Sequence, residues 1–526
     1  QDAGSDGRGL MGQSSSLAAQ SPRLRRVQLP SCGSLGRCQE EPDGSPAGAG
    51  ASSSSAPGAF AAAARRVVEQ LCKERLDVNP GAPDIHEFSI FNGVCTNDIE
   101  EVLHLAGRDA RAKRAMGALV GLAVADSVGG MFEFLPVGQK GSWFDPKTLR
   151  VVGEYNKFSL KPGQWTDDTS MALCLADSLL TCGGYDGSDI RIRFWNWWNK
   201  GYNNTFRRDG SRTKSVGLGG NVSLSLITIN VTDDSPSPRF EGLGEDAGNG
   251  SVMRLAPVPI YYHCNIDLAV RMSAESSYTT HPGRSAADAC AFLGYVIARA
   301  ITRETKRGPQ TAARFLDACA EEYLARPEAQ EQPHLQRLLR SSEPPGSRER
   351  CWNWRDPAGP YILETIRARG PAYNGYPVTP TYFGSYSMDG LAIALHSVYH
   401  TRSFMAAISR CVNFLGDADS TGAVCGQIAG AFYGVSGVDP RLVARLRTWD
   451  AGEIALRAAL LCALGNTMSE EEQRRARGLA HGALSVDRHV DAPQAVLEAK
   501  TAAAPAAGQA GDGPAEPGGE GETSAA

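Results

Sequence analysis

Apolar residues recur with the period of an α-helix through most of the chain between residues 58 and 464. The stretches that carry this pattern are 58–73, 98–115, 117–134, 171–180, 389–415, 421–434 and 451–464. The segment 265–303 contains two more helical patterns, which are separated at Thr280–Gly283 because proline and glycine interrupt helices. Strand-like alternation of apolar and polar residues is confined to 221–231. The pattern therefore predicts an all-α fold, a compact bundle of many helices.

Two of these stretches carry small residues at every fourth position. The first set is Gly117, Gly121, Ala125 and Gly129, and the second is Gly422, Gly426, Gly430 and Gly434. Each glycine in a helix costs about 1 kcal/mol relative to alanine, so four on one face indicate that something packs closely there. A flexible glycine-rich loop is the alternative, but Val424, Ile428 and Phe432 are also four apart and favour a helix. We expect the two helices to lie deep in the bundle with their backbones near one another.

Composition divides the chain into a central part and two flanks. The first 57 residues are rich in Ser, Gly, Pro and Ala, and the last 27 are Ala, Gly, Pro and Glu with almost nothing to bury, which is typical of disorder. The predicted divisions are a disordered tail (1–57), a helical extension (58–107), a main domain (108–465) that includes a Pro-, Gly- and charge-rich surface elaboration (325–385), and a mostly disordered C-terminal segment (466–526).

Charge and cysteine content narrow the class of protein. The net charge is −5, from 53 basic and 58 acidic residues, and no dense basic stripe is present, which argues against nucleic-acid binding. The 13 cysteines form no C-x-x-C pair, so reduced thiols and an intracellular, cytoplasmic location are expected. No run approaches 18 apolar residues, so no transmembrane segment is expected. If translation starts at Met11, residues 11–16 match the myristoylation pattern, and the Ser- and Arg-containing N-terminus also fits a targeting peptide.

Two acidic clusters, Thr166–Thr169 and Asp417–Ser420, each stand directly before an apolar helical pattern. Such residues also cap helices, but one cap explains one polar residue and not four in succession. An EF-hand is excluded because its glycine and its distant glutamate are missing from their places. Carboxylates and hydroxyls without Cys or His suit Mg²⁺, Mn²⁺ or Ca²⁺ and argue against zinc. We interpret the clusters as two halves of a binuclear metal centre.

Other candidate residues have two interpretations each. His396 and His400 are four apart on a predicted helix and have the spacing of metal ligands, but no third ligand is evident, which favours packing. His281 either closes a helix before Pro282 or binds a ligand. Glu133, taken alone, reads as an ordinary loop carboxylate.

Five motifs together resemble the ADP-ribosylglycohydrolase superfamily, which includes the dinitrogenase-reductase-activating and ADP-ribosyl-acceptor hydrolases. In chain order they are Gly117–Gly129 leading to Glu133, Gln164–Ser170, Gly248–Arg254, Thr280–Pro282, and Gly416–Gly422 continuing to Gly434. Ala125 stands where the family usually has glycine, and Ser420 stands where it commonly has threonine, which keeps a hydroxyl. Asp246 and Ala247 replace other residues before the glycine turn, which puts the contacts to diphosphate or adenosine in doubt.

The resemblance implies a helical fold with two Mg²⁺ ions, or Mn²⁺, in a central cleft. The metal ligands that it implies are Thr166, Asp167, Asp168, Asp417, Asp419 and Ser420. The substrate-binding residues that it implies are Gly248, Asn249, Gly250, Ser251 and His281. Glu133 falls where some members keep a catalytic glutamate, and Asp168 is the second catalytic candidate because it is placed to hold the attacking water.

The predicted activity is hydrolysis of the N- or O-glycosidic bond at C1″ of ADP-ribose, in an ADP-ribosylated protein or a small ADP-ribose conjugate. Two alternatives stay open. One is an inactive ADP-ribose-binding or structural protein on the same scaffold. The other is a phosphoesterase, for which Arg254 is the one candidate phosphate clamp. A monomer is expected, and the sequence leaves the acceptor undetermined.

Overall fold

The computed structural model of the chain describes residues 56–468 except 233–234, 243–246, 305–310 and 375. The predicted disordered tail, apart from its last two residues, and nearly all of the segment 466–526 lie outside the described residues, as does the pattern at residues 11–16.

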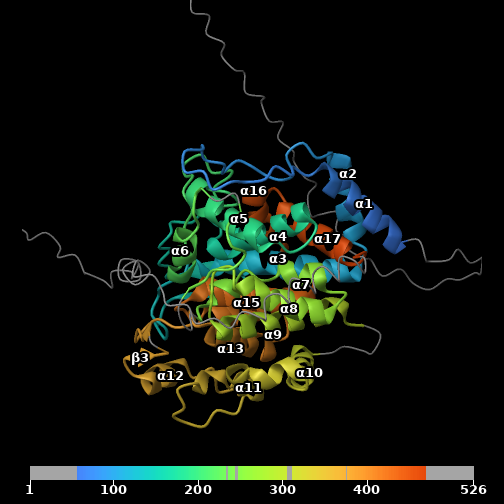
Figure 1. Ribbon diagram of the computed structural model, residues 1–526. Helices are drawn as coiled ribbons and strands as arrows, with labels where there is room; N and C mark the ends of the chain where they lie inside the picture. The colour runs from blue at the N-terminus through green and yellow to red at the C-terminus, as the bar shows by residue number, and fades with distance from the viewer. Residues whose placement is uncertain (1–55, 233–234, 243–246, 305–310, 375, 469–526) are drawn as a thin grey trace, which may run out of the picture.

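Helices make up most of the described structure (Figure 1). The α-helices are α1 (Ala56–Gln70), α2 (Thr96–Ala106), α3 (Ala110–Gly129), α4 (Asp167–Cys182), α5 (Gly187–Lys200), α6 (Gly220–Ile227), α7 (Pro257–Tyr262), α8 (Ile266–Ser277), α9 (Arg284–Thr302), α10 (Ala312–Leu324), α11 (Pro333–Arg340), α12 (Ile362–Arg369), α13 (Ser387–Tyr399), α14 (Phe404–Val412), α15 (Ala418–Tyr433), α16 (Pro440–Asp450) and α17 (Glu453–Gly465). The 3₁₀ helices are η2 (Asn249–Ser251), η3 (Pro327–Glu331), η4 (Arg350–Trp352) and η5 (Val435–Gly437). The predicted all-α fold is confirmed.

Strands are few and short in the described residues. β1 (Trp143–Asp145) pairs antiparallel with β2 (Arg150–Val152), and β3 (Ala372–Tyr373) pairs antiparallel with β4 (Tyr376–Pro377). Each pair is an isolated two-stranded ribbon, so the core rests on helix packing.

The centre of the bundle is the contact between α3 and α15, which lie along each other in Figure 1. A Cβ atom added to Gly430 would lie 1.9 Å from the carbonyl oxygen of Gly117, and one added to Gly426 would lie 2.2 Å from that of Gly121. The predicted close approach of the two small-residue stripes is therefore confirmed. Gly434 is the exception, because α15 ends before it and Gly434 adopts a positive φ of 76° at the helix C-terminus.

Three predicted stretches differ in detail. The stretch 98–115 is divided between α2 and α3, and Asp109 caps α3 by accepting a hydrogen bond from the N–H of Ala112 (2.7 Å). The stretch 389–415 is divided between α13 and α14. The strand-like alternation at 221–231 was misleading, because this segment is largely the helix α6. Its buried residues also satisfy a helical period, since they include Val222, Ser225, Leu226 and Ile229.

The helical extension packs on the rest of the molecule through α5 and α17. Ser89 donates a hydrogen bond to Glu453 at the start of α17 (2.8 Å), and the ammonium group of Lys200 in α5 donates to the carbonyl oxygen of Pro80 (2.8 Å). These contacts join segments that are far apart in sequence.

The segment 325–385 contributes buried side chains as well as surface. Trp352 and Trp354 are fully buried. The indole of Trp352 donates to Asp389 in α13 (2.9 Å), and the guanidinium of Arg369 forms a buried ion pair with the same carboxylate (2.8 Å). This elaboration therefore has a small core of its own against α13.

Among the described residues, α9 is the one helix with the length and composition of a membrane span. However, 89% of that stretch is buried within the fold, as expected for a core helix.

Candidate metal centre

The two acidic motifs meet at the N-termini of α4 and α15, as the sequence predicted. Oxygen atoms of Glu133, Asp417 and Asp419 lie within 4.8 Å of one another. Asp419 also lies close enough to Asp167 and Asp168 for its charge to raise the pKa of both carboxyl groups. Residues 249 positions apart in the chain (417 minus 168) therefore share one buried site.

Helix capping does not explain the two motifs. Thr166 and Asp417 occupy the N-cap positions of α4 and α15, but neither side chain makes a capping hydrogen bond. Their side chains instead make hydrogen bonds within the cluster: the Thr166 hydroxyl donates to Asp126 (2.8 Å), and Asp417 accepts from Asn249 (2.8 Å).

Asp126 in α3 organises the first motif, and sequence analysis did not identify this role. Its carboxylate accepts hydrogen bonds from the backbone N–H groups of Thr166 and Thr169 (both 3.0 Å) and from the hydroxyl of Thr169 (2.6 Å). Burial, followed by the charge of Asp419, raises the pKa of Asp126 to about 7. The available signal was a carboxylate in an otherwise apolar helix, which requires buried partners.

Asp168 provides the clearest indication that the cluster is suited to a cation. One of its carboxylate oxygens lies 3.0 Å from the hydroxyl of Thr166, whereas the other, Oδ1, is buried without a hydrogen-bond partner. Leaving a buried charged acceptor unsatisfied is costly. The surrounding donors are oxygens, and this chemistry fits Mg²⁺ or Mn²⁺ better than zinc.

The electrostatics of the cluster support the same interpretation. Burial, followed by neighbouring carboxylates, raises the pKa values of Asp167 and Asp168 well above the usual range. Burial and Asp419 raise the pKa of Asp417 to about 8. A bound divalent cation would relieve this mutual repulsion.

The second motif is held by hydrogen bonds from outside α15 and by one within its first turn. The side-chain amide of Asn249 donates to Asp417 (2.8 Å) and to the carbonyl oxygen of Gly384 (3.1 Å). The backbone N–H of Ser420 donates to Asp419 (2.9 Å), and the Ser420 hydroxyl lies 3.5 Å from the sulfur of Met253. Asn249 thus connects the second acidic motif to the predicted substrate-binding turn.

Glu133 is buried among these groups. Its carboxylate accepts hydrogen bonds from the backbone N–H of Ala418 (3.0 Å) and from the hydroxyl of Tyr382 (2.8 Å). Burial, followed by Asp419 and Asp417, raises the pKa of Glu133 well above its usual range. This environment is unlike that of an ordinary loop carboxylate.

The predicted substrate-binding residues form a turn that packs against His281. A Cβ atom added to Gly250 would lie 2.9 Å from the imidazole Cε1, and one added to Gly248 would lie 3.3 Å from Nε2. Ser251 is buried, and its hydroxyl lies 2.8 Å from that of Ser277. Burial, followed by Arg254, lowers the pKa of His281 to about 3, so this imidazole is neutral near pH 7.

A second glycine-rich segment, residues 217–220, lies against the first acidic motif. Sequence analysis did not predict this contact. A Cβ atom added to Gly217, which has a φ of 91°, would lie 2.0 Å from Oδ1 of Asp167. Gly219 and Gly220 have open space around them and lead into α6. The local signal was three glycines in four residues.

The contacts of His396 and His400 agree with a packing role and not with metal binding. A ring nitrogen of each lies 3.2 Å from the same carbonyl oxygen, that of Trp354. The guanidinium of Arg410 lies 2.8 Å from the other ring nitrogen of His396.

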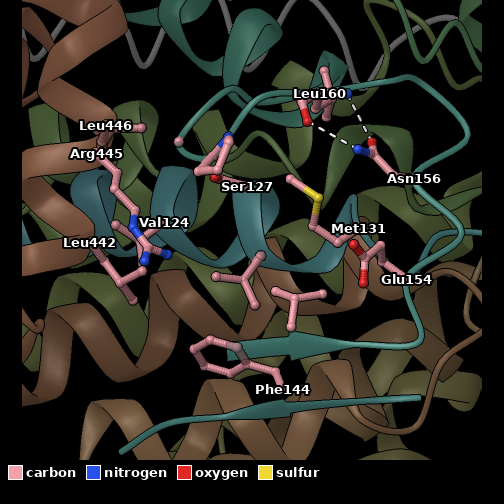
Figure 2. A pocket seen from close by; sticks show the side chains of 14 residues that line it. Val124, Ser127, Met131, Phe144, Glu154, Asn156, Leu160, Leu442, Arg445 and Leu446 are labelled. Carbon is pink, nitrogen blue, oxygen red and sulfur yellow. Dashed lines mark hydrogen bonds between the residues drawn. The ribbon is translucent and has the colours of Figure 1, made fainter. Parts of the chain in front are cut away.

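The structure also contains a cavity of about 190 Å³ (Figure 2). Its lining includes Val124 and Ser127 from α3, Met131 from the segment after α3, and Glu154 and Arg445. None of the clustered carboxylates lines this cavity. The cavity is therefore not the place where the predicted site residues gather.

Comparison with known proteins places this cluster in a family. Residues 107–474 match the model of the family described as ADP-ribosylglycohydrolase. The chain belongs to the ADP-ribosylglycohydrolase family.

Two relatives of this ADP-ribosylglycohydrolase align with it over most of their own length. The ADP-ribosylarginine hydrolase Tri1 of Pseudomonas putida (strain GB-1) is 28% identical over 394 residues, covering 71% of this chain and 84% of the relative. The ADP-ribosyl-[dinitrogen reductase] glycohydrolase of Rhodospirillum rubrum is 28% identical over 353 residues, covering 67% and 96%. A solved structure titled "ADP-ribosylglycohydrolase-related protein complex" is 30% identical, with a TM-score of 0.48, and covers 67% of this chain and 99% of its own.

The predicted family, fold class and enzyme class are therefore confirmed, and the protein is a hydrolase of glycosidic bonds to ADP-ribose. The family is metal-dependent, and the acidic cluster is suited to a metal. The individual roles of the site residues stay predictions.

Proposed function

We propose that this ADP-ribosylglycohydrolase uses two Mg²⁺ ions, replaceable by Mn²⁺, to release ADP-ribose from an ADP-ribosylated protein. The observation that carries the proposal is the buried, unpartnered Oδ1 of Asp168 within a cluster of carboxylates drawn from the N-termini of α4 and α15 and from the segment after α3. The names of the relatives, an ADP-ribosylarginine hydrolase and an ADP-ribosyl-[dinitrogen reductase] glycohydrolase, support a protein substrate.

The ligands would come from two sides of the site. The candidates from one side are Thr166, Asp167 and Asp168, and those from the other are Asp417, Asp419 and Ser420. When bound, the ions would supply positive charge that orients the ribose hydroxyls and polarises a water molecule. Asp126 and Asn249 would keep the two ligand groups in place through their hydrogen bonds.

Glu133 is the proposed proton donor. Burial and the neighbouring carboxylates raise its pKa well above the usual range, which favours the protonated form, and a hydrogen bond from Tyr382 holds the group beside Asp417 and Asp419. In the reaction, the bond between C1″ and the acceptor breaks, and the acceptor atom takes the proton of Glu133. A bond forms between C1″ and a water oxygen, and the water proton returns to Glu133. Asp168 would orient this water, and nearby carboxylates would stabilise the oxocarbenium-like transition state.

Two glycine-rich segments are suited to the diphosphate. The turn from Gly248 to Ser251 is tied to Asp417 through Asn249, and residues 217–220 lie against Asp167 at the start of α6. Glycines allow backbone N–H groups to approach phosphate oxygens, and a helix N-terminus favours negative charge.

The direct test compares the wild type with Glu133→Gln, Asp168→Asn and Asp419→Asn. Each protein would be assayed for ADP-ribose release from ADP-ribosylated proteins and peptides in Mg²⁺, in Mn²⁺ and in chelator. We expect release by the wild type in either metal and loss in chelator. Glu133→Gln should lower kcat by roughly 10²–10⁴-fold, the usual contribution of a general acid. Asp145→Asn is the matched control, because the Asp145 carboxylate accepts hydrogen bonds from Lys147 and Thr148, neither of which belongs to the cluster.

The alternative of an inactive ADP-ribose-binding protein predicts a different result. Calorimetry would then show that ADP-ribose binds in Mg²⁺, while no linked substrate is hydrolysed. Metal-independent release, or full activity of Asp168→Asn, would contradict the proposed centre.

A further inference from the structure

Three aromatic residues form a cluster directly outside Glu133, which we name the aromatic platform: Phe134, Phe158 and Tyr382. The ring of Phe134 is stacked on that of Tyr382, with centroids 5.6 Å apart and planes 19° apart. Phe158 meets Phe134 edge-on at 6.1 Å. Phe134 nevertheless remains 47% exposed, so a large apolar ring is left without full cover.

The platform is connected to the catalytic cluster by hydrogen bonds. The hydroxyl of Tyr382 donates to Glu133, and the backbone N–H of Phe134 donates to the carbonyl oxygen of Gly416, the residue before Asp417 (3.1 Å). Glu133 is buried among the carboxylates, whereas the next side chain, Phe134, faces solvent. The platform therefore lies at the boundary between the site and the surface.

The backbone of Phe134 is strained. Its φ of 68° lies in the left-handed region, where a bulky residue is a genuine outlier. Strain of this kind persists where the surrounding structure enforces it, and it concentrates at functional sites. A glycine at this position would avoid the strain, whereas the strained phenylalanine here still leaves about half of its side chain exposed.

We propose that the aromatic platform binds the acceptor side chain of the substrate and selects a planar cation, the guanidinium of ADP-ribosylated arginine. This inference rests on the proposed function. With the ribose at the acidic cluster, the group attached to C1″ lies on the side of Glu133, because Glu133 must reach the acceptor atom. A guanidinium stacks on an aromatic face through cation–π attraction. A serine-linked acceptor has no planar cation and gains no such contact.

The test uses two peptides of identical sequence that carry ADP-ribose either on arginine or on serine. KM and kcat for release would be measured for the wild type, Phe134→Leu and Tyr155→Leu. Leucine is as strained as phenylalanine at a positive φ, so Phe134→Leu removes the aromatic face and leaves the backbone problem unchanged. Tyr155 is the matched control, because it is 51% exposed and near Phe158 in sequence but outside the platform.

We expect Phe134→Leu to raise KM for the arginine-linked peptide by roughly tenfold more than for the serine-linked peptide, the size expected from a cation–π contact. Tyr155→Leu should leave both KM values within twofold of wild type, by the same reasoning. Tyr382→Phe keeps the stacked ring but loses the hydrogen bond to Glu133, so it should lower kcat and change KM little.

Equal effects of Phe134→Leu on the two peptides, or preference of the wild type for the serine-linked peptide, would contradict the proposal that the aromatic platform selects arginine. If the wild type releases ADP-ribose from neither peptide, the proposed function fails by itself. In that case, dissociation constants of the same two peptides, measured by calorimetry, take the place of KM. Selective weakening of the arginine-linked peptide in Phe134→Leu would still support the platform, and its absence would refute it.

Discussion

At the scale of single residues, Gly217 shows how closely the site is assembled. Its φ of 91° disfavours any residue with a Cβ, and that atom would lie 2.0 Å from Oδ1 of Asp167. We expect Gly217→Ala to displace the Asp167 carboxylate and weaken Mn²⁺ binding by roughly tenfold or more, as loss of a supporting contact does at other metal sites. Calorimetric titration with Mn²⁺ measures this change, and kcat/KM should fall in parallel.

Gly219 supplies the control for that experiment. It lies two residues further along, has ordinary space for a Cβ, and has no positive φ. Gly219→Ala should therefore retain near wild-type Mn²⁺ affinity. Equal affinities for Gly217→Ala and the wild type would show that Asp167 is not held by this contact, or is not a ligand.

Sequence alone identified the residues whose polarity stood out against an apolar helix. Asp167, Asp168, Asp417 and Asp419 were found for that reason, and the structure brings them together. Sequence alone did not identify the roles of Asp126 and Gly217. Their roles depend on what faces them from another element, namely the backbone of Thr166 for Asp126 and the carboxylate of Asp167 for Gly217. Such information is absent from local sequence.

At the scale of elements, the contact between α3 and α15 depends on glycine. Alanine normally stabilises a helix relative to glycine by about 1 kcal/mol. At Gly430 the sign should reverse, because an added Cβ would lie 1.9 Å from the Gly117 carbonyl oxygen and force the helices apart. We expect Gly430→Ala to lower the free energy of unfolding by at least about 1–3 kcal/mol, the usual cost of overpacking. Equilibrium urea denaturation measures it.

Gly58 in α1 provides the opposite case. No atom lies within 4 Å of a Cβ added there. Gly58→Ala should leave stability unchanged or raise it by up to about 1 kcal/mol. A Gly430→Ala variant as stable as the wild type would mean that α3 and α15 are not in backbone contact.

Periodicity predicted the helices whose buried faces are apolar, and it failed where charges are buried. The α5 helix was missed because Arg191 and Arg193 interrupt its apolar pattern, although both are buried. Arg193 is satisfied by an ion pair with Asp189 (2.6 Å) and by the hydroxyl of Tyr202 (2.8 Å). A pattern of polarity cannot distinguish a paired, buried arginine from an exposed one.

At the scale of the whole molecule, Glu453 ties two distant segments to α17: it contacts Ser89 and Arg207, and it also pairs with Arg457 one turn along its own helix. Burial alone would raise the pKa of Glu453, but the two arginines outweigh it and lower the pKa to about 2. Because the folded-state pKa lies below the unfolded value, the stabilisation is present above about pH 4.5 and is lost as the pH falls toward 2. It amounts to about 3 kcal/mol at neutral pH, since one pKa unit corresponds to about 1.4 kcal/mol.

Urea denaturation of the wild type and Glu453→Gln at several pH values tests this network. The wild type should be more stable at pH 6, and the difference should shrink as the pH falls below about 4.5. Glu154→Gln, a change at an exposed carboxylate, is the control for a general effect of removing charge. A difference between wild type and Glu453→Gln that does not vary with pH would contradict the assigned ionisation.

The acidic cluster makes the stability of the metal-free protein depend on pH in the opposite direction. Burial, with a contribution from Asp419, raises the pKa of Asp126 to about 7 and that of Asp417 to about 8. The folded state therefore retains protons that the unfolded chain releases near pH 4, so the metal-free protein loses stability as the pH rises from about 4 to 8. Metal binds the deprotonated ligands and stabilises the folded state by mass action.

The increase in Tm on replacing chelator with Mg²⁺ should consequently grow from pH 5 to pH 8, and Asp168→Asn should reduce this increase at every pH. Thermal unfolding followed by circular dichroism measures both effects. An increase in Tm that is the same at pH 5 and pH 8 would show that metal does not compete with protons for these carboxylates, and the binuclear centre would have to be sought elsewhere.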